Sequence, residues 1–273
     1  MQRSLVSAVV QLNSQADLRS NLTACEEHVR EAAGRGAEFV LLPENFAWFA
    51  ADDDRARVAE DLDEGGPIID WLRQLAAELG IAIVGGGLPE RSEDPRRPFN
   101  TCVVVEKGGR VAARYRKMHL FDAELPDGTR FAESATTTPG REPVVVAVGK
   151  MRVGLSICYD LRFPELYRRL VRAGAEVMVV PSAFTERTGR DHWHALLRAR
   201  AIENQVWVLA ANQWGRHPGG RECYGHSLIV DPWGGITAEV SRGVGSATGR
   251  VDLERVELTR RRLPCLEHAK LTL

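Results

Sequence analysis

Residues 36–44 read GAEFVLLPE, and residues 174–182 read GAEVMVVPS. In both stretches a Gly-Ala-Glu turn leads into four apolar residues and a proline, and an amphipathic segment comes before the turn. Glycine commonly ends a helix, and an unbroken apolar run is typical of a strand buried on both faces. Either two helix-to-strand junctions are alike by chance, or the chain has two pseudo-symmetric halves, with two sheets stacked face to face and helices outside.

Apolar runs rich in valine and isoleucine alternate with amphipathic stretches along the chain. Strands are predicted at residues 4–12, 37–44, 81–87, 100–106, 143–149 and 152–159. Helices are predicted at residues 21–36 and 68–80, and a polar loop at residues 122–141. Interleaved strands and helices predict an α/β fold, and a loop that long is usually functional. The three glycines at 85–87 lack the lysine and hydroxyl residue of a phosphate loop, so we expect them only to turn the backbone after a strand.

The composition is that of an ordinary globular protein, with 44% hydrophobic and 27% charged residues and a formal net charge of -1 over 273 residues. This balance does not indicate nucleic acid or an anionic membrane as a partner. No stretch reaches the ~20 apolar residues of a membrane helix, and the N-terminus lacks a long apolar core with a cleavage pattern. We therefore expect a single cytoplasmic domain over residues 1–273.

The cysteines are scattered, and they form neither a Cys-x-x-Cys pair nor a zinc-type cluster, so neither a disulfide framework nor a metal is indicated. Cys158 stands apart because it follows a buried strand and precedes a helix that Pro164 can begin. Such an elbow exposes a side chain at the sheet edge beside backbone N–H groups, which can stabilise a thiolate and an oxyanion. Most single cysteines are instead small buried hydrophobes, a description that suits Cys25 and Cys102 better.

Two other positions carry chemistry at strand ends. Glu44 directly follows a buried strand and its Pro43 stop, which is where α/β sheets usually hold catalytic groups. Lys117 lies in the basic cluster at residues 114–117, just before the long polar loop. Taken alone, each residue is equally well described as a solvated side chain in a turn.

Glu44 in LLPEN, Lys117 in YRKMHLFD and Cys158 in ICYD together resemble the carbon–nitrogen hydrolase (nitrilase) superfamily, whose signature is Glu, Lys and Cys in that order. The resemblance covers nearly the whole chain and puts the family's accessory glutamate on Glu133 in RFAES. It implies a four-layer α-β-β-α sandwich that pairs into an eight-layer homodimer. It implies no cofactor and a small-molecule amide as the substrate.

Amide hydrolysis requires a strong nucleophile, an oxyanion site and a proton for the departing nitrogen. On the resemblance, Cys158 attacks the amide carbon to give a thioester, and Glu44 serves as the base and then as the acid. Lys117 and the backbone N–H of Tyr159 hold the oxyanion, while Glu133 orients Lys117 and Glu44.

The segments ICYDLRFPEL and YGHSLIVDPWG are similar to the branch of deaminated-glutathione amidases and the neighbouring ω-amidases. For such a substrate, Arg162 is expected to bind a keto-acid carboxylate and Arg187 a tail carboxylate. The alternative for Arg162 is a surface salt bridge. Phe46 and Phe184 follow the two echoed strands, so they either form apolar walls of the substrate pocket or pack in the core.

Several other readings stay open. The chain is alternatively an ω-amidase for 2-oxoglutaramate, a nitrilase or carbamoylase, or a scaffold on an inactivated amidase fold. A papain-like pairing of Cys158 with a histidine lacks that family's cysteine signature, although His119, His192, His194 and His226 are present. His194 and Arg198 share a helix face, but the sequence shows no third ligand for a metal.

Overall fold

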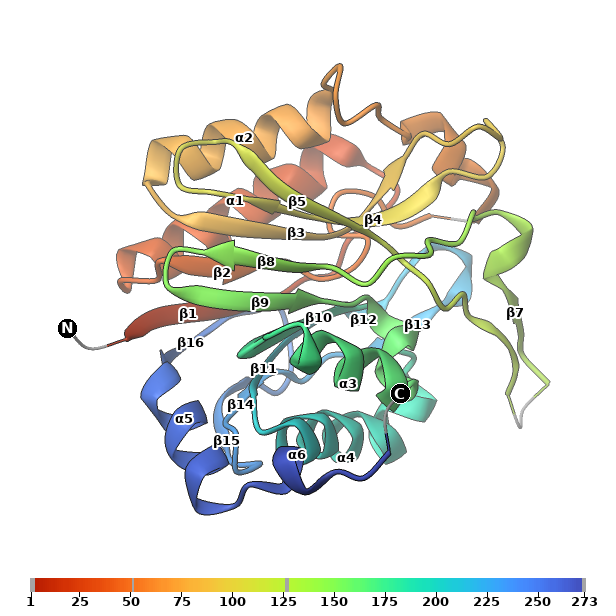
Figure 1. The fold of residues 1–273 in the computed structure, drawn as a ribbon. Helices are drawn as coiled ribbons and strands as arrows, with labels where there is room; N and C mark the ends of the chain where they lie inside the picture. The colour runs from red at the N-terminus through yellow and green to blue at the C-terminus, as the bar shows by residue number, and fades with distance from the viewer. Residues whose placement is uncertain (1–2, 51, 126–127, 272–273) are drawn as a thin grey trace.

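Two β-sheets face one another in the middle of the molecule, and helices cover the outer side of each sheet (Figure 1). The computed structural model describes residues 3–50, 52–125 and 128–271. Within these ranges, no helix is long and apolar enough to cross a membrane.

The first sheet has the strand order β16-β1-β2-β3-β4-β5. Its strands are β1 (Ser4–Gln11), β2 (Phe39–Leu41), β3 (Ala82–Glu90), β4 (Phe99–Val105), β5 (Val111–Arg116) and β16 (Gly245–Asp252). β1, β2 and β3 are mutually parallel, and β16, β4 and β5 join by antiparallel pairing. Helices α1 (Leu18–Gly34) and α2 (Pro67–Leu79) lie on its outer face.

The second sheet has the strand order β15-β14-β11-β10-β9-β8. Its strands are β8 (Val145–Val148), β9 (Met151–Leu155), β10 (Val177–Ser182), β11 (Trp207–Asn212), β14 (Ser227–Val230) and β15 (Ile236–Val240). β9, β10 and β11 are parallel, and the other three pair antiparallel. Helices α3 (Pro164–Arg172) and α4 (Glu186–Asn204) cover this sheet, and α5 (Leu253–Arg262) and α6 (Cys265–His268) follow near the end of the chain.

The two sheets repeat one plan. Each has three parallel strands in the middle, one antiparallel strand on one side and an antiparallel pair on the other. The echoed segments form β2 and β10, which hold the same place in their sheets. The prediction of an α/β fold with two stacked sheets is therefore confirmed, and the echo reflects a real similarity between the halves.

Side chains alternate along the strands as a two-residue period requires. Val9, Phe39 and Leu41 belong to the large core cluster that includes the second sheet, whereas Ala8 and Val40 pack with α1 and α2. Both faces of the first sheet are thus buried. This explains why its central strands read as unbroken apolar runs.

The glycines at 85–87 lie inside β3 and do not form the turn that the sequence suggested. A Cβ on Gly86 would stand 2.1 Å from Cβ of Pro181, which belongs to the opposite sheet, and 2.3 Å from the Leu42 carbonyl oxygen. Gly87 has φ 70° and lies against Glu44 and Asn100. Only glycine fits at these two positions, because other parts of the chain approach the strand closely.

The long segment 122–141 is more ordered than a plain loop. It contains the hairpin of β6 (Asp122–Glu124) and β7 (Arg130–Ala132), followed by the short 3-10 helix η2 (Glu133–Ala135). A second small hairpin joins β12 (Trp214–Arg216) to β13 (Glu222–Tyr224) around η4 (Pro218–Gly220). Both hairpins supply walls of the cavity described below.

Candidate active site

The carboxyl ends of strands from both sheets meet at one edge of the sandwich. β2 and β5 run in the same direction because β3 is parallel to β2 and two antiparallel pairings separate β3 from β5. Glu44 therefore follows β2, and Lys117 follows β5, at the same edge. Cys158 follows β9 of the second sheet and opens the 3-10 helix η3 (Cys158–Arg162).

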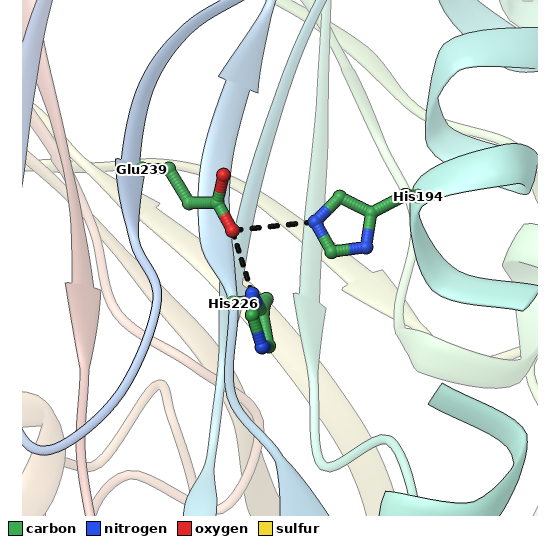
Figure 2. A group of neighbouring side chains, drawn as sticks. All are labelled: His194, His226 and Glu239. Carbon is green, nitrogen blue, oxygen red and sulfur yellow. Dashed lines mark hydrogen bonds and ion pairs between the residues drawn. The ribbon is translucent and has the colours of Figure 1, made fainter. Parts of the chain in front are cut away.

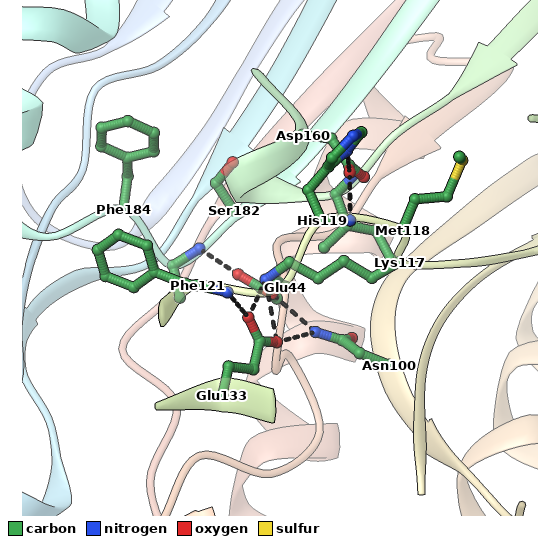
Figure 3. Close-up of polar contacts among 12 residues, drawn as sticks. Glu44, Asn100, Lys117, Met118, His119, Phe121, Glu133, Asp160, Ser182 and Phe184 are labelled. Carbon is green, nitrogen blue, oxygen red and sulfur yellow. Dashed lines mark hydrogen bonds and ion pairs between the residues drawn. The ribbon is translucent and has the colours of Figure 1, made fainter. Parts of the chain in front are cut away.

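The Lys117 ammonium lies at the centre of a buried polar cluster (Figure 3). Its Nζ donates to Oε1 of Glu44 at 3.0 Å and to Oε1 and Oε2 of Glu133 at 3.0 and 2.8 Å. The Lys117 side chain is only 2% exposed. A buried ammonium is stable only with such partners, and here two carboxylates share it.

Glu44 is held from both sheets. Its Oε1 also accepts a hydrogen bond from Nδ2 of Asn100 at 2.8 Å, and its Oε2 accepts one from the backbone N–H of Ala183 at 2.9 Å. Ala183 directly follows β10, so the two echoed strand ends are joined through the Glu44 carboxylate. Three donors, Lys117, Asn100 and the Ala183 N–H, thus fix the carboxylate in one orientation.

Glu133 is anchored by the backbone of the segment that precedes it. The N–H of Phe121 donates to its Oε2 at 2.7 Å, and Asn100 donates to its Oε1 at 3.3 Å. The sequence resemblance indicated Glu133 but gave no signal for Asn100. Asn100 contacts both carboxylates of the cluster, and only the folded pairing of β4 with β5 brings it there.

Cys158 has the backbone of a strained elbow, with φ 47° in the left-handed region. Asp160, two residues later, holds the elbow from inside. Its fully buried carboxylate accepts hydrogen bonds from the Ile157 N–H at 2.8 Å, the Tyr115 hydroxyl at 2.7 Å and the His119 N–H at 3.1 Å. Asp160 thereby connects the turn at Cys158 to the segment on either side of Lys117.

Burial of the Cys158 thiol favours its protonated form. Burial raises the pKa of the Cys158 thiol well above its ordinary value, the nearby Glu44 carboxylate raises it further, and Lys117 acts in the opposite direction. Burial alone would lower the pKa of Lys117, but Glu133 and Glu44 raise it above its usual value. At rest the site therefore contains a neutral thiol beside an ammonium, so a reaction that uses this sulfur as a nucleophile would need a base.

The Cys158 sulfur opens into a cavity of about 830 Å³. Glu44, Lys117, Glu133 and Cys158 all line it, and so does Arg187, whose binding of a tail carboxylate stays a prediction. No histidine is among the lining residues in the described part of the chain, which disfavours a papain-like arrangement. The wall also includes the aromatic rings of Phe49, Phe121 and Phe131 and a group of arginines, Arg55, Arg130, Arg187, Arg190 and Arg221.

Three other side chains proposed from the sequence lie outside this lining. Phe46 is fully buried among the residues that pack against α1 and α2. Phe184 is 4% exposed, and its ring packs against Trp193 with the centroids 5.0 Å apart. The Arg162 guanidinium lies 5.1 Å from the Phe184 ring centroid, and its Nη1 is 3.2 Å from Nδ1 of His192. For both phenylalanines the structure matches the core-packing alternative.

Tyr159 is half-buried, and its ring meets those of Phe121 and Phe163 edge-on at 4.9 and 5.3 Å. Its N–H belongs to the turn that carries the Cys158 sulfur. The oxyanion role of this N–H stays a prediction.

A second polar group lies on the surface of the second sheet (Figure 2). Oε1 of Glu239 is 2.6 Å from Nδ1 of His226 and 3.2 Å from Nε2 of His194. One side-chain N or O atom from each of the three residues lies within 4.8 Å of the others, which is close enough for one metal ion to contact all three. The sequence showed no third ligand for His194, because β14 and β15 bring His226 and Glu239 to α4 only in the fold.

The model of the carbon–nitrogen hydrolase family matches residues 7–261. This chain belongs to the carbon–nitrogen hydrolases. Deaminated glutathione amidase of Homo sapiens is 44% identical to this hydrolase over 270 residues, which cover 96% of this chain and 81% of the human protein. Deaminated glutathione amidase of Synechocystis is 40% identical over 266 residues, covering 96% of this chain and 97% of the relative.

A solved structure supports the same conclusion for the fold. The crystal structure of the Caenorhabditis elegans NitFhit protein superimposes on the hydrolase with a TM-score of 0.91 at 38% sequence identity. The alignment covers 98% of this chain and 65% of that protein. The family expectation drawn from Glu44, Lys117 and Cys158 is thus confirmed.

Proposed function

We propose that this hydrolase cleaves the amide bond of deaminated glutathione and releases 2-oxoglutarate and cysteinylglycine. The observation that carries the chemistry is the Lys117 ammonium held between Glu44 and Glu133 in the cavity that contains the Cys158 thiol. The substrate follows from relatives of that name at 40–44% identity over 96% of the chain. The reaction is metabolite repair of an unwanted keto acid.

In the first half-reaction, Glu44 takes the proton from the Cys158 sulfur while the sulfur attacks the amide carbon. The oxygen of the tetrahedral intermediate is negative, and the Lys117 ammonium and the Tyr159 backbone N–H stabilise it. Glu44 then returns the proton to the departing nitrogen, so the C–N bond breaks and cysteinylglycine leaves as a neutral amine. A thioester between Cys158 and the 2-oxoglutaryl group remains.

In the second half-reaction, Glu44 removes a proton from water, and the hydroxide formed attacks the thioester carbonyl. Collapse of this intermediate breaks the C–S bond, and the proton on Glu44 returns to the sulfur. Glu44 thus accepts a proton twice and donates a proton twice in each catalytic cycle, which requires that its carboxylate keep its position. Asn100, Lys117 and the Ala183 N–H hold it from three sides.

A panel of amides tests this function. The purified protein should hydrolyse deaminated glutathione with a higher kcat/KM than 2-oxoglutaramate or any nitrile, as measured by release of 2-oxoglutarate, cysteinylglycine or ammonia. Cys158→Ala should remove all turnover, and a mass increase on Cys158 with a slow substrate would reveal the thioester. Undiminished hydrolysis by Cys158→Ala would overturn the whole assignment.

We also propose that the protein acts as a homodimer in an eight-layer sandwich, as the family resemblance implies. Several large apolar side chains are exposed near the outer side of the second sheet. Trp233 is 63% exposed, Ile202 on α4 is 47% exposed, and Ile236 on β15 is 41% exposed. A Cβ built on Gly234 would stand 2.6 Å from Cδ1 of Ile202, so Ile202 lies beside the turn that carries Trp233.

A further inference from the structure

Arg55 is a buried arginine in the wall of the active-site cavity, and no motif in the sequence singles it out. It lies in the 3-10 helix η1 (Asp52–Val58) and is only 8% exposed. It lines the same cavity as Cys158, Lys117 and Glu133. Burial acts to raise the pKa of Glu133, but the positive charge of Lys117, and after it that of Arg55, lowers this pKa below its ordinary value.

The guanidinium of Arg55 has an unsatisfied edge. Its Nε and Nη2 are buried, and neither has a hydrogen-bond partner among the described residues. Nε–H and one N–H of Nη2 point in parallel from one side of the planar group, which is the fork that binds the two oxygens of a carboxylate. A buried charge without a partner is costly, so an anion that completes this edge would bind tightly.

Other arginines of the wall are engaged with the protein. Arg130 pairs with Glu124, and Arg190 pairs with Glu186, at 3.0 and 2.9 Å. The Arg221 guanidinium lies 5.8 Å from the Phe131 ring centroid. Arg55 thus combines burial in the cavity wall with a donor edge that no described protein group occupies.

We propose that Arg55 binds a carboxylate of the substrate through its Nε and Nη2 edge, and so selects amides that carry a negative charge. This inference rests on the proposed function, because deaminated glutathione has two carboxylates. One belongs to the keto acid on the acyl side, and the other ends the cysteinylglycine tail. Both offer the same chemistry to the fork of Arg55.

The test compares Arg55→Gln, which removes charge and fork, with Arg55→Lys, which retains only the charge. Arg57→Gln is the matched control, because Arg57 lies in the same 3-10 helix but its side chain is 79% exposed. KM and kcat are measured with deaminated glutathione, with 2-oxoglutaramate, and with 4-oxopentanamide, in which a methyl group replaces the carboxylate of 2-oxoglutaramate.

With Arg55→Gln, KM for deaminated glutathione should rise about tenfold to a hundredfold, the loss expected for a charge-assisted hydrogen-bonded pair. KM for 4-oxopentanamide should rise much less, and Arg55→Lys should fall between the wild type and Arg55→Gln. If KM for 2-oxoglutaramate rises equally, Arg55 binds the keto-acid carboxylate; if only KM for deaminated glutathione rises, it binds the tail. Equal KM changes for charged and neutral amides would overturn the inference.

A binding measurement separates this inference from the proposed function. In Cys158→Ala, which lacks the nucleophile, calorimetry measures the affinity for 2-oxoglutarate and for cysteinylglycine with and without Arg55→Gln. A tenfold or greater loss of affinity for one of them supports the inference even if the wild type does not cleave deaminated glutathione. Unchanged affinity for both contradicts it.

Discussion

At the scale of single residues, the candidate site depends on how one ammonium balances two carboxylates. Lys117 neutralises Glu44 and Glu133, and in the proposed mechanism it also faces the reacting oxygen. Removing it leaves two negative charges in a buried position with a single amide, Asn100, shared between them. The structural and the chemical consequences of its loss are therefore coupled.

Lys117→Met should abolish hydrolysis and lower the free energy of unfolding by about 3–5 kcal/mol, the usual cost of leaving a buried charge unpaired. Denaturant unfolding and product release measure the two effects. Lys107→Met is the control, since Lys107 is exposed and its replacement should change neither quantity appreciably. Normal activity in Lys117→Met would contradict the proposed oxyanion role.

The pH dependence of stability reports on Glu133. Although burial acts to raise its pKa, Lys117 and Arg55 lower it below the ordinary 4.5. A carboxyl group whose pKa is lower in the folded state stabilises the fold above its unfolded pKa, and this stabilisation is lost as the pH falls through the folded value. The melting temperature of wild type should exceed that of Glu133→Gln most at neutral pH, and the gap should shrink below about pH 4. A gap that is constant from pH 7 to pH 3 would contradict this assignment.

At the scale of elements, the active site depends on how closely β3 approaches its neighbours. Gly87 combines a positive φ with contact to the site, because a Cβ there would stand 2.8 Å from Cγ of Glu44 and 2.7 Å from Oδ1 of Asn100. The backbone of β3 at Gly87 thus lies directly against the Glu44 side chain. A side chain at this position would push the carboxylate out of place.

Gly87→Ala should destabilise the protein by more than about 1 kcal/mol, because alanine is strained at positive φ. It should also lower kcat strongly by displacing Glu44. Gly108→Ala provides the comparison, since a Cβ at Gly108 meets no other atom within 4 Å. Circular dichroism melting measures the stability of both variants, and steady-state kinetics measure their kcat. If Gly87→Ala and Gly108→Ala have the same melting temperature and the same kcat, the close approach of Gly87 to Glu44 is not important for the site.

The sequence predicted elements well where local pattern decides them. The apolar runs gave the central strands, and the Gly-Ala-Glu echo gave two equivalent strands, β2 and β10. Prediction from the sequence failed at glycines 85–87 and in the segment 122–141, where neighbours distant in the chain decide the conformation. Long-range contact explains the missed site residues too. Asn100 and Arg55 lie in segments without any catalytic motif, and only folding brings them to Glu133.

At the scale of the whole molecule, the exposed apolar side chains around Trp233 bear on assembly. Exposed apolar side chains that gather in one patch mark a surface for a partner more often than isolated ones do. The cluster lies beside the edge strand β15, whose free side can also meet another chain.

Trp233→Asp should shift the protein from dimer to monomer, because a carboxylate cannot be buried in an apolar contact without a partner. Sedimentation velocity across a range of concentrations measures the change. Lys107→Asp, on the exposed turn between β4 and β5, serves as the control. A wild-type protein that sediments as a monomer at all concentrations would end the dimer proposal.

The hydrogen bond from Ala183 to Glu44 has a consequence for how the protein is made in the cell. A ribosome completes the first sheet's central strands, with Glu44 and Lys117, well before it adds β10 and the residue that fixes the base. Cys158 also emerges before its surroundings are finished. A nascent or truncated chain that stops short of Ala183 lacks one of the donors that hold Glu44. In the proposed mechanism, amide cleavage therefore begins only after the second half of the chain has been synthesised and docked.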